Sequence, residues 1–401
     1  MELLTLAQRN SVLEEMINLL DSHRALLINA NKKDLDAYDP SDRAMYDRLI
    51  MNDYKIDGMI SAVRDIHADT DPIGVLKYDW DHPNGMQVQN KTAPFGTIMI
   101  IYESRPDVTI EAAVVAFKSN NRILLKGGKE ALHSNLALVD LWHQALKSAG
   151  LSNDWITFLQ LNRQQTQEYL KTPPVQIDLI VPRGGEGLIN YVKTHASCPV
   201  LVSGRGNNFM YIHDDANHDM AEELIFQSKI QKISACNSLD KVLINENLSD
   251  VSSFLTSLMD KLKAQNVEIL VTERVNELLK SNRYSVISDD SVWYEEFLAM
   301  KIVIGMVSDM DGAVSLINTY SGGHSVSIVS ESKIKASKFM DVIDAAAVYH
   351  NVSTRFTDGG QMGVGAEMAI STDKLHHRGP LGLHQLVTNK WYVFGTGQTR
   401  Q

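Results

Sequence analysis

From Pro94 onward the chain alternates short apolar runs with amphipathic segments of about ten to fifteen residues. The short runs predict strands and the longer segments predict helices. Strands that alternate with helices form a parallel sheet covered on both faces, so the sequence predicts an α/β fold. The first expected strands are Thr97–Tyr102, Arg122–Lys126, Trp155–Leu159, Ile177–Val181 and Val200–Ser203. The helices expected beside them are Val108–Lys118, Ala131–Ser148, Arg163–Leu170 and Gly187–His195.

A second α/β stretch begins after Lys229 and is long enough to form a domain of its own. Its expected elements are Lys241–Asn245, Val251–Ala264, Val267–Val271, Ile302–Val307, Met310–Tyr320 and Val326–Val329. Roughly the first 70 residues have apolar side chains at helical spacing and predict packing helices. Two extended segments, Val75–Pro94 and Leu386–Phe394, stand apart from both domains. Exposed strands of this kind commonly pair with another subunit, so a homo-oligomer is expected.

Charge and cysteine content exclude several classes of protein. The formal net charge is −11, and no segment clusters the Lys and Arg that neutralise phosphates, so no nucleic-acid partner is expected. The first residues lack a basic region before an apolar core, and no apolar run approaches about 18 residues, so neither export nor a membrane partner is expected. Two cysteines in 401 residues fit a reducing compartment, which predicts a cytoplasmic protein.

One of the two cysteines is a candidate nucleophile. Cys236 lies in the run Lys232-Ile233-Ser234-Ala235-Cys236-Asn237-Ser238, a small and polar surround that suits an exposed thiol. The alternative is an inert, packed side chain, which is the commoner fate of a free cysteine. Cys198 precedes Pro199 and an apolar run, and we interpret it as structural.

Two turns that follow expected strands combine glycine with a cation. Lys126-Gly127-Gly128-Lys129-Glu130 follows one strand, and Pro182-Arg183-Gly184-Gly185 follows another. In parallel sheets ligands bind beyond the carboxyl ends of the strands. Glycine allows close backbone approach, the next helix offers free N–H groups, and a cation can meet a phosphate, so both turns suit an anionic dinucleotide. The alternative is a plain turn with a solvated charge.

Several blocks of sequence together resemble one family. They are Ile101-Tyr102-Glu103-Ser104-Arg105-Pro106, Ile123-Leu124-Leu125-Lys126-Gly127-Gly128, Val181-Pro182-Arg183-Gly184-Gly185, Ala235-Cys236-Asn237, Ser353-Thr354-Arg355-Phe356-Thr357-Asp358-Gly359-Gly360 and His377-Arg378-Gly379-Pro380. From about Lys91 to Gln398 the chain resembles the gamma-glutamyl phosphate reductase family of the aldehyde dehydrogenase superfamily.

This resemblance implies an aldehyde-dehydrogenase-like fold with a Rossmann-type cofactor domain, an α/β catalytic domain and a β-hairpin for oligomerisation. The cofactor domain is expected at residues 1–228, with 75–94 as part of the hairpin, and the catalytic domain at 229–350. Residues 351–385 are expected to return to the cofactor domain with a substrate-binding turn, and 386–401 to form an oligomerisation strand.

The resemblance also implies a reaction, the NADPH-dependent reduction of L-glutamyl 5-phosphate to L-glutamate 5-semialdehyde, which is the second step of proline synthesis. Cys236, as a thiolate, would attack the acyl phosphate carbonyl, expel phosphate and leave a thioester that hydride then releases. Hydrolytic aldehyde dehydrogenases carry a glutamate base in a strand that looks equivalent to Leu201–Gly206, where this chain has Val202-Ser203. Without a base to activate water, the thioester would survive.

Binding residues carry over from the resemblance by position. Lys126 and Glu130 look like the pair that meets the adenine ribose, and Glu296 looks like the glutamate that holds the nicotinamide ribose. The expected cofactor-binding residues are Lys126, Gly127, Lys129, Glu130, Arg183, Gly184, Gly185 and Glu296. An arginine can bind the α-carboxylate of glutamate with two donors, which favours Arg105 and the Ser353–Arg355 turn. The expected substrate-binding residues are Arg105, Asp107, Ser353, Thr354 and Arg355.

The chain departs from the family pattern at Asp107, where an asparagine resembles the superfamily's oxyanion donor. An ionised Asp107 would repel the developing charge, and loss of such a donor typically costs about 10²–10³ in rate. Three explanations are open: burial protonates Asp107, another donor such as the Cys236 backbone N–H suffices, or Asp107 serves the substrate amine. We favour the last.

Further departures surround the candidate nucleophile. Asn208-Phe209 stands where the family often has Cys-His, and the residues before Cys236 lack the family's Thr and Arg-Pro. These changes remove a possible auxiliary thiol and alter the cationic surround that would lower the pKa of Cys236, for which Lys229 and Lys232 are the expected substitutes.

Two other readings of function stay open. One is a related acyl-phosphate or semialdehyde dehydrogenase with a different acid substrate. The other is a weakly active partner of glutamate 5-kinase that shelters its labile product. No metal is expected, because the histidines do not form a HExxH motif and His213 and His218 are five positions apart.

Overall fold

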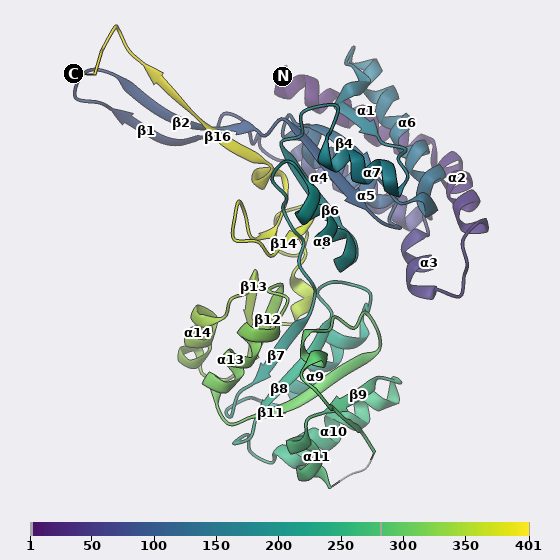
Figure 1. Cartoon of the computed structure of the whole chain (residues 1–401), viewed down its shortest axis with the longest axis vertical. Coiled ribbons are helices and arrows are strands. Elements are labelled where there is room, and N and C mark those ends of the chain that lie inside the picture. The colour runs from purple at the N-terminus through teal and green to yellow at the C-terminus, as the bar shows by residue number, and fades with distance from the viewer. Residues whose placement is uncertain (1–2, 281–282, 401) are drawn as a thin grey trace. The chain divides into compact units, whose positions relative to one another are not determined.

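The computed structural model describes residues 3–280 and 283–400, which form two compact units (Figure 1). Unit 1 comprises Met1–Ser203, Gly363–Ala369 and Leu375–Gln401, and unit 2 comprises Gly204–Met362 and Ile370–Lys374. The boundary between the units differs from the one expected at residues 228 and 229. Strand β7 (Asn208–Ile212) already pairs with β8 (Leu239–Asn245) and β12 (Ser325–Val329) in the sheet of unit 2, so the chain enters that unit 25 residues earlier than expected (229 − 204).

Unit 1 is built on a parallel sheet with the strand order β5-β4-β3-β6. Its strands are β3 (Thr97–Tyr102), β4 (Arg122–Lys126), β5 (Ile156–Phe158) and β6 (Leu179–Arg183). Its flanking helices are α5 (Asp107–Lys118), α6 (Leu132–Ser148), α7 (Arg163–Lys171) and α8 (Glu186–His195). The expected strand Val200–Ser203 is wrong, because Val200 makes a single bridge to Ile180 and the chain then leaves the sheet.

The two faces of this sheet carry alternate residues, as the period of a β-strand requires. Ile98 and Ile100 of β3 pack against α1, α4, α5 and α6, whereas Met99 and Ile101 pack against α7 and α8. The N-terminal helices of unit 1 are α1 (Leu6–Ser22), α2 (Arg24–Asp36), α3 (Arg43–Leu49) and α4 (Asp53–Ala68). Thr5 and Gln8 form a capping box that begins α1.

A separate antiparallel sheet of unit 1 has the order β1-β2-β16 and extends as a long arm from the helices of that unit (Figure 1). Its strands are β1 (Leu76–Asp81), β2 (Gln87–Pro94) and β16 (Val387–Phe394). Large apolar side chains on it are solvent-exposed, namely Leu76, Tyr78, Trp80, Trp391, Val393 and Phe394. An exposed apolar sheet of this kind is typical of a surface that another chain covers.

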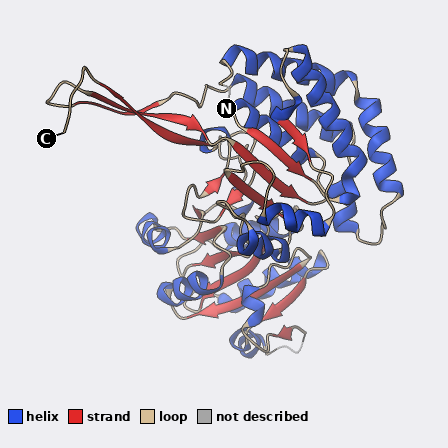
Figure 2. Ribbon diagram, turned by 45° about the horizontal axis from the view of Figure 1, so that its top comes forward, coloured by secondary structure: helices blue, strands red, loops and turns tan. Residues whose placement is uncertain are grey.

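Unit 2 contains a larger parallel sheet with the order β10-β9-β11-β8-β7-β12-β13 (Figure 2). Besides β7, its strands are β8 (Leu239–Asn245), β9 (Glu268–Val271), β10 (Ser285–Val286), β11 (Lys301–Val307), β12 (Ser325–Val329) and β13 (Ala347–His350). Helices α9 (His218–Ile230) and α10 (Val251–Ala264) cover one face, and α13 (Met310–Tyr320) and α14 (Lys333–Val342) cover the other. Two shorter helices are α11 (Glu273–Leu279) and α12 (Ser291–Tyr294).

The remaining elements are short. They are the 3₁₀ helices η1 (Lys129–Ala131), η2 (Asn153–Trp155), η3 (Thr354–Phe356) and η4 (Leu383–Gln385), and the strands β14 (Ile370–Ser371) and β15 (Gly379–Pro380). Within residues 3–280 and 283–400, none of the helices combines the length and apolar character that a bilayer span requires.

Candidate active site

Cys236 lies in the loop that joins α9 to β8, at the amino-terminal edge of the unit 2 sheet. Its side chain is half-buried, and the loop turns through hydrogen bonds from Ala235 N to Lys232 O (3.2 Å) and from Ser238 N to Ala235 O (3.0 Å). The rule that ligand-binding residues follow the strands therefore does not find Cys236, which precedes its strand.

The side chain of Asn208 holds the backbone of this loop. Its Nδ2 atom lies 2.7 Å from each of three carbonyl oxygens, those of Gly206, Cys236 and Ser238, and its Oδ1 accepts from Ser325 N at 3.1 Å. Asn208 is fully buried at the start of β7. Sequence reasoning treated Asn208 as the loss of a family residue, whereas the structure makes it a positioning residue for Cys236.

Replacement of Asn208 by alanine is expected to slow the alkylation of Cys236 by iodoacetamide about 10-fold or more and to lower the free energy of unfolding by about 1–3 kcal/mol. The physical reason is that buried carbonyl oxygens lose their donor and the loop that carries the sulfur shifts. Asn247→Ala is the matched control, because exposed Asn247 donates a single hydrogen bond to Ser308 O at 3.2 Å. Equal alkylation rates in both variants would refute the positioning role.

The Ser353–Thr357 segment is tied to the same loop. Asn237 Nδ2 donates to the carbonyl oxygens of Arg355 (3.1 Å) and Thr357 (2.9 Å), and Thr354 Oγ1 donates to Asn237 O (2.8 Å). The Ser353 hydroxyl lies 2.6 Å from that of Ser228 on α9. The structure therefore brings together four of the expected site residues, Cys236, Ser353, Thr354 and Arg355.

Among the expected cations near Cys236, Lys229 is already paired. Its side chain is fully buried, and Nζ donates to Asp240 Oδ1 at 3.0 Å. Burial lowers the pKa of Lys229, although the partner carboxylate opposes this effect. Arg355 instead interacts electrostatically with Cys236, and burial lowers the pKa of its guanidinium. Sequence reasoning had placed Arg355 with the substrate and did not connect it with the sulfur.

Buried charges also hold the peptide groups on either side of Glu296. Lys241 Nζ donates to Glu295 O at 2.7 Å, and Phe297 N donates to Asp240 Oδ2 at 3.1 Å. Burial lowers the pKa of Lys241 to about 7. Its ammonium nitrogen also lies 3.8 Å from the centre of the Phe297 ring. The backbone at Glu296 is thus fixed from both directions, a role for Asp240 and Lys241 that no sequence motif indicated.

In unit 1, the other expected residues follow the carboxyl ends of the adjacent strands β4, β3 and β6. Glu130 Oε1 accepts from both the backbone N and the hydroxyl of Ser104 at 2.7 Å. Lys126 Nζ donates to Gly127 O at 2.7 Å, and Gly185 N donates to Glu103 Oε2 at 3.3 Å. Of the remaining residues of the set, Arg183 is the last residue of β6, Gly184 follows it, and Lys129 begins the 3₁₀ helix after β4. The sheet therefore gathers Arg105, Asp107 and the two glycine turns at one edge.

Asp107 is the first residue of α5 and lies in a cationic surround. Its carboxylate lies 2.8 Å from Arg105 Nη2 and 3.5 Å from Lys55 Nζ. Burial opposes ionisation, but Arg105, Lys55 and Arg183 outweigh it and hold the pKa of Asp107 well below its usual range. This direction argues against the explanation that burial protonates Asp107.

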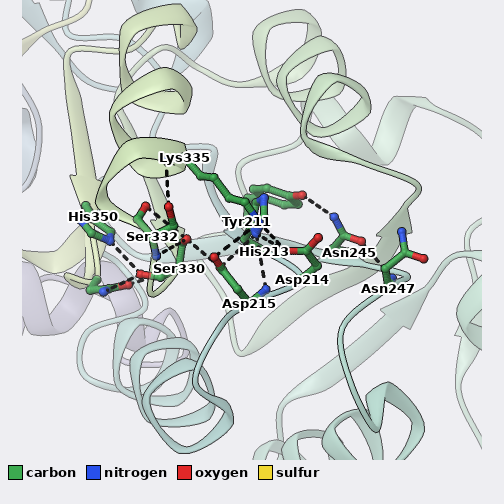
Figure 3. Close-up of polar contacts among 11 residues, drawn as sticks. Tyr211, His213, Asp214, Asp215, Asn245, Asn247, Ser330, Ser332, Lys335 and His350 are labelled. Atoms are coloured by element: carbon green, nitrogen blue, oxygen red, sulfur yellow. Dashed lines mark hydrogen bonds and ion pairs between the residues drawn. The ribbon is translucent and has the colours of Figure 1, made fainter.

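A second polar cluster of unit 2 lies where β7 and β12 end, at the opposite edge of the sheet from Cys236 (Figure 3). His213 Nδ1 lies 2.7 Å from Asp214 Oδ1 and 3.0 Å from Asp215 Oδ1. Ligand atoms of these three residues lie within 4.8 Å of one another. Lys335 Nζ lies 3.0 Å from Asp214 and 3.6 Å from Asp215, so one ammonium is shared by the two carboxylates. We interpret the cluster as an ion-pair network between the two strand ends.

Comparisons with known proteins agree with this architecture. The family model described as "Aldehyde dehydrogenase family" matches residues 1–275. The gamma-glutamyl phosphate reductase of Persephonella marina is 37% identical over 399 residues, which cover 98% of this chain and 89% of that protein. The protein of the same name from Aquifex aeolicus is also 37% identical, over 98% of this chain and 91% of its own length.

Solved structures extend the likeness to the fold. The crystal structure of gamma-glutamyl phosphate reductase from Thermotoga maritima has a TM-score of 0.92 and 37% identity, covering 99% of this chain and 95% of that one. An acetylating aldehyde dehydrogenase from Geobacillus thermoglucosidasius, 18% identical over 99% of this chain and 94% of its own, shares the fold with a TM-score of 0.71. The predicted aldehyde-dehydrogenase-like α/β fold is confirmed. The chain belongs to the aldehyde dehydrogenase family and, within it, to the gamma-glutamyl phosphate reductases.

Proposed function

We propose that this protein is an oxidoreductase that converts L-glutamyl 5-phosphate to L-glutamate 5-semialdehyde and phosphate, the second step of proline biosynthesis. The observation that carries the proposal is the half-buried Cys236, whose backbone is held by Asn208 and whose loop is tied to Arg355. This arrangement occurs in a chain that shares 37% identity with gamma-glutamyl phosphate reductases over nearly its whole length.

The proposed chemistry begins with the Cys236 thiolate. Its sulfur attacks the acyl carbon, the bond from that carbon to the phosphate oxygen breaks, and phosphate leaves with the electron pair. A nicotinamide cofactor supplies the hydride that reduces the resulting thioester. Val202 and Ser203 stand where hydrolytic relatives place a base, so this chain has no carboxylate there to activate water against the thioester.

The turns of unit 1 fit an anionic dinucleotide. A Cβ atom at Gly185 would meet nothing within 4 Å, and the Glu103 carboxylate accepts from Gly185 N at the amino end of α8. Lys126, Lys129 and Arg183 supply positive charge at the same sheet edge. We propose that these turns hold the cofactor phosphates and that Glu296 holds the nicotinamide ribose. The extra 2′-phosphate of NADPH suits the two lysines, which is the basis for proposing NADPH.

Asp107 is proposed to bind the substrate ammonium beside Arg105. In this role Asp107→Asn raises the Michaelis constant for the semialdehyde by about 10-fold or more, equivalent to one lost charge-assisted hydrogen bond, and changes turnover less. Steady-state rates of the reverse reaction measure both constants. Asp65→Asn, a change on the exposed side of α4, is the control. A fall in turnover with an unchanged Michaelis constant would discard this role.

Substrate identity is tested by comparing semialdehydes and acyl phosphates of different chain length on the purified protein. The proposal expects the highest kcat/KM for the five-carbon glutamate derivative. Preference for another acid would favour the related-dehydrogenase alternative, for which the change to Asp107 is the motivating observation. A folded protein without cysteine-dependent activity would favour the weakly active partner of glutamate 5-kinase.

Assembly is proposed on the arm formed by β1, β2 and β16. Its exposed Trp80, Trp391 and Phe394 would be covered in a homo-oligomer. A cytoplasmic location and an association with glutamate 5-kinase also belong to the proposal. Light scattering of the purified chain tests the proposed assembly. A monomer in solution would contradict it, because the three side chains would stay uncovered.

A further inference from the structure

One charged side chain beside Cys236 has hydrogen-bonding atoms that its surroundings do not satisfy. The Nε and Nη1 atoms of Arg355 are buried and have no hydrogen-bond partner among residues 3–280 and 283–400. The guanidinium interacts electrostatically with Cys236 and Asp358. A desolvated cation with unused donors is unfavourable, and an anion that accepts from them would relieve that cost.

The residues that follow Cys236 contribute further unsatisfied atoms. Asn237 is 6% exposed and Ser238 is 3% exposed. In the described part of the chain, Asn237 Oδ1 and Ser238 Oγ have no hydrogen-bond partner. The Nδ2 atom of Asn237 is by contrast committed to the backbone of Arg355 and Thr357. These bonds fix the base of the Arg355 side chain relative to the cysteine loop, whereas the buried Ser238 hydroxyl makes no hydrogen bond to the described residues.

We propose that Arg355, with the Ser238 hydroxyl, forms the subsite for the phosphoryl group of the acyl phosphate. The inference rests on the proposed function and assigns Arg355 to the phosphoryl end of the substrate and not to its α-carboxylate. In an acyl phosphate, one bridging oxygen joins the phosphorus to the carbon that the sulfur attacks. A cation beside the sulfur is therefore close to the phosphoryl group. The α-carboxylate lies at the far end of the carbon chain. A guanidinium can also donate to a phosphate from several N–H groups, and the buried Nε and Nη1 atoms of Arg355 are two donors without a partner in the described residues.

This subsite acts on a defined step. As the C–S bond forms, the carbonyl π electrons move to oxygen. When they return, the C–O bond to phosphate breaks and its electron pair leaves with phosphate. Arg355 offsets the charge that gathers on that leaving group. In the reverse direction Arg355 holds inorganic phosphate while its oxygen attacks the thioester, and Cys236 departs as the thiolate.

In the reverse reaction, phosphate and semialdehyde are separate substrates, so the binding of each can be measured by itself. Without phosphate, semialdehyde and NADP⁺ give one burst of NADPH per Cys236; with phosphate, they turn over. We expect Arg355→Gln to keep the burst amplitude, to raise the Michaelis constant for phosphate by at least about 10-fold, and to change that for semialdehyde by less than about 2-fold. Arg355→Lys should recover part of the phosphate affinity, because the charge remains without the parallel donors.

Two results would overturn the subsite. One is a raised Michaelis constant for semialdehyde with phosphate unaffected, which would assign Arg355 to the α-carboxylate. The other is loss of the burst in a variant whose circular dichroism and thermal unfolding match the unmodified protein. Absence of any burst in the unmodified protein is a different outcome, because it would reject the proposed function before any variant is compared.

A measurement on the unmodified protein covers the case in which Arg355→Gln does not fold. Iodoacetate carries a negative charge and iodoacetamide does not, and mass spectrometry reads their products at Cys236 separately from Cys198. We expect iodoacetate to react faster relative to iodoacetamide than with a free thiol, and inorganic phosphate to remove this advantage. An iodoacetate rate that phosphate leaves unchanged would reject the subsite.

Discussion

Cys236→Ala is expected to abolish phosphate-dependent formation of NADPH from NADP⁺ and glutamate 5-semialdehyde, with a loss of at least about 10⁴-fold in kcat. The physical reason is that neither the thioester nor its precursor can form without the sulfur. The absorbance of NADPH, followed with purified protein at saturating phosphate, measures the effect. The substitution removes one sulfur from a half-buried loop, so the protein should remain folded.

Cys198→Ala is the matched control for this prediction. Cys198 lies in unit 1, and burial, followed by the charge of Asp178, raises the pKa of its thiol. A thiol of this kind is a poor nucleophile at neutral pH. The control variant should therefore keep nearly full activity, and activity that survives in Cys236→Ala but fails in Cys198→Ala would reverse the assignment of the nucleophile.

Gly206→Ala is expected to give the second large effect, a loss of about 10²-fold in kcat. A Cβ atom at this position would overlap the carbonyl oxygen of Cys236 and lie 2.6 Å from its Cα atom. These are backbone atoms, so the cysteine loop must shift as a whole, and the sulfur moves away from the position in which Asn208 and Asn237 hold it. Overpacking of this kind also costs about 1–3 kcal/mol of unfolding free energy.

Gly58→Ala tests whether this effect depends on the site. Gly58 lies inside α4, and a Cβ atom there would meet nothing within 4 Å. Alanine should leave activity unchanged and raise the free energy of unfolding by about 0.5–1 kcal/mol, because glycine is unfavourable within a helix. Comparison of kcat, alkylation rate at Cys236 and thermal unfolding for both variants decides the matter. Normal turnover in Gly206→Ala would show that the loop tolerates the shift.

The predicted strands are confirmed where an apolar run is short and bounded by turns. Thr97–Tyr102 and Arg122–Lys126 are the strands β3 and β4 with the same limits. The boundary between the units was displaced because β7 was not identified, although Phe209-Met210-Tyr211-Ile212 is a buried apolar run that could have indicated it. Val200–Ser203 has an equally apolar sequence but does not continue along a neighbouring strand. Local composition does not reveal whether a partner strand is present.

Some residues of the candidate site could be predicted from the sequence, and others only from the structure. Cys236 and the Ser353–Arg355 turn were found from short sequence blocks, and the structure places them together. Asn208 and Asn237 were noted only as a departure and as part of a family block, without a positioning role, and Asp240 and Lys241 were missed, because a buried charge has no motif of its own. Asp107 was identified as unusual, but one of the cations that lower its pKa against the effect of burial, after Arg105, is Lys55, which is 52 positions away in the chain (107 − 55).

The sequence by itself determined the α/β alternation, the candidate nucleophile and the family, because each depends on residues that lie within one strand, one helix or one turn. The tertiary structure alone decided what surrounds the sulfur. Asn208 reaches the carbonyl of Cys236 across 28 positions, and Asn237 reaches that of Arg355 across 118. It also decided the direction in which the pKa of Asp107 moves, since the attraction of three cations outweighs burial only when folding brings them together. Hydrogen bonds and charges act over a few ångströms in space, whatever the separation along the chain.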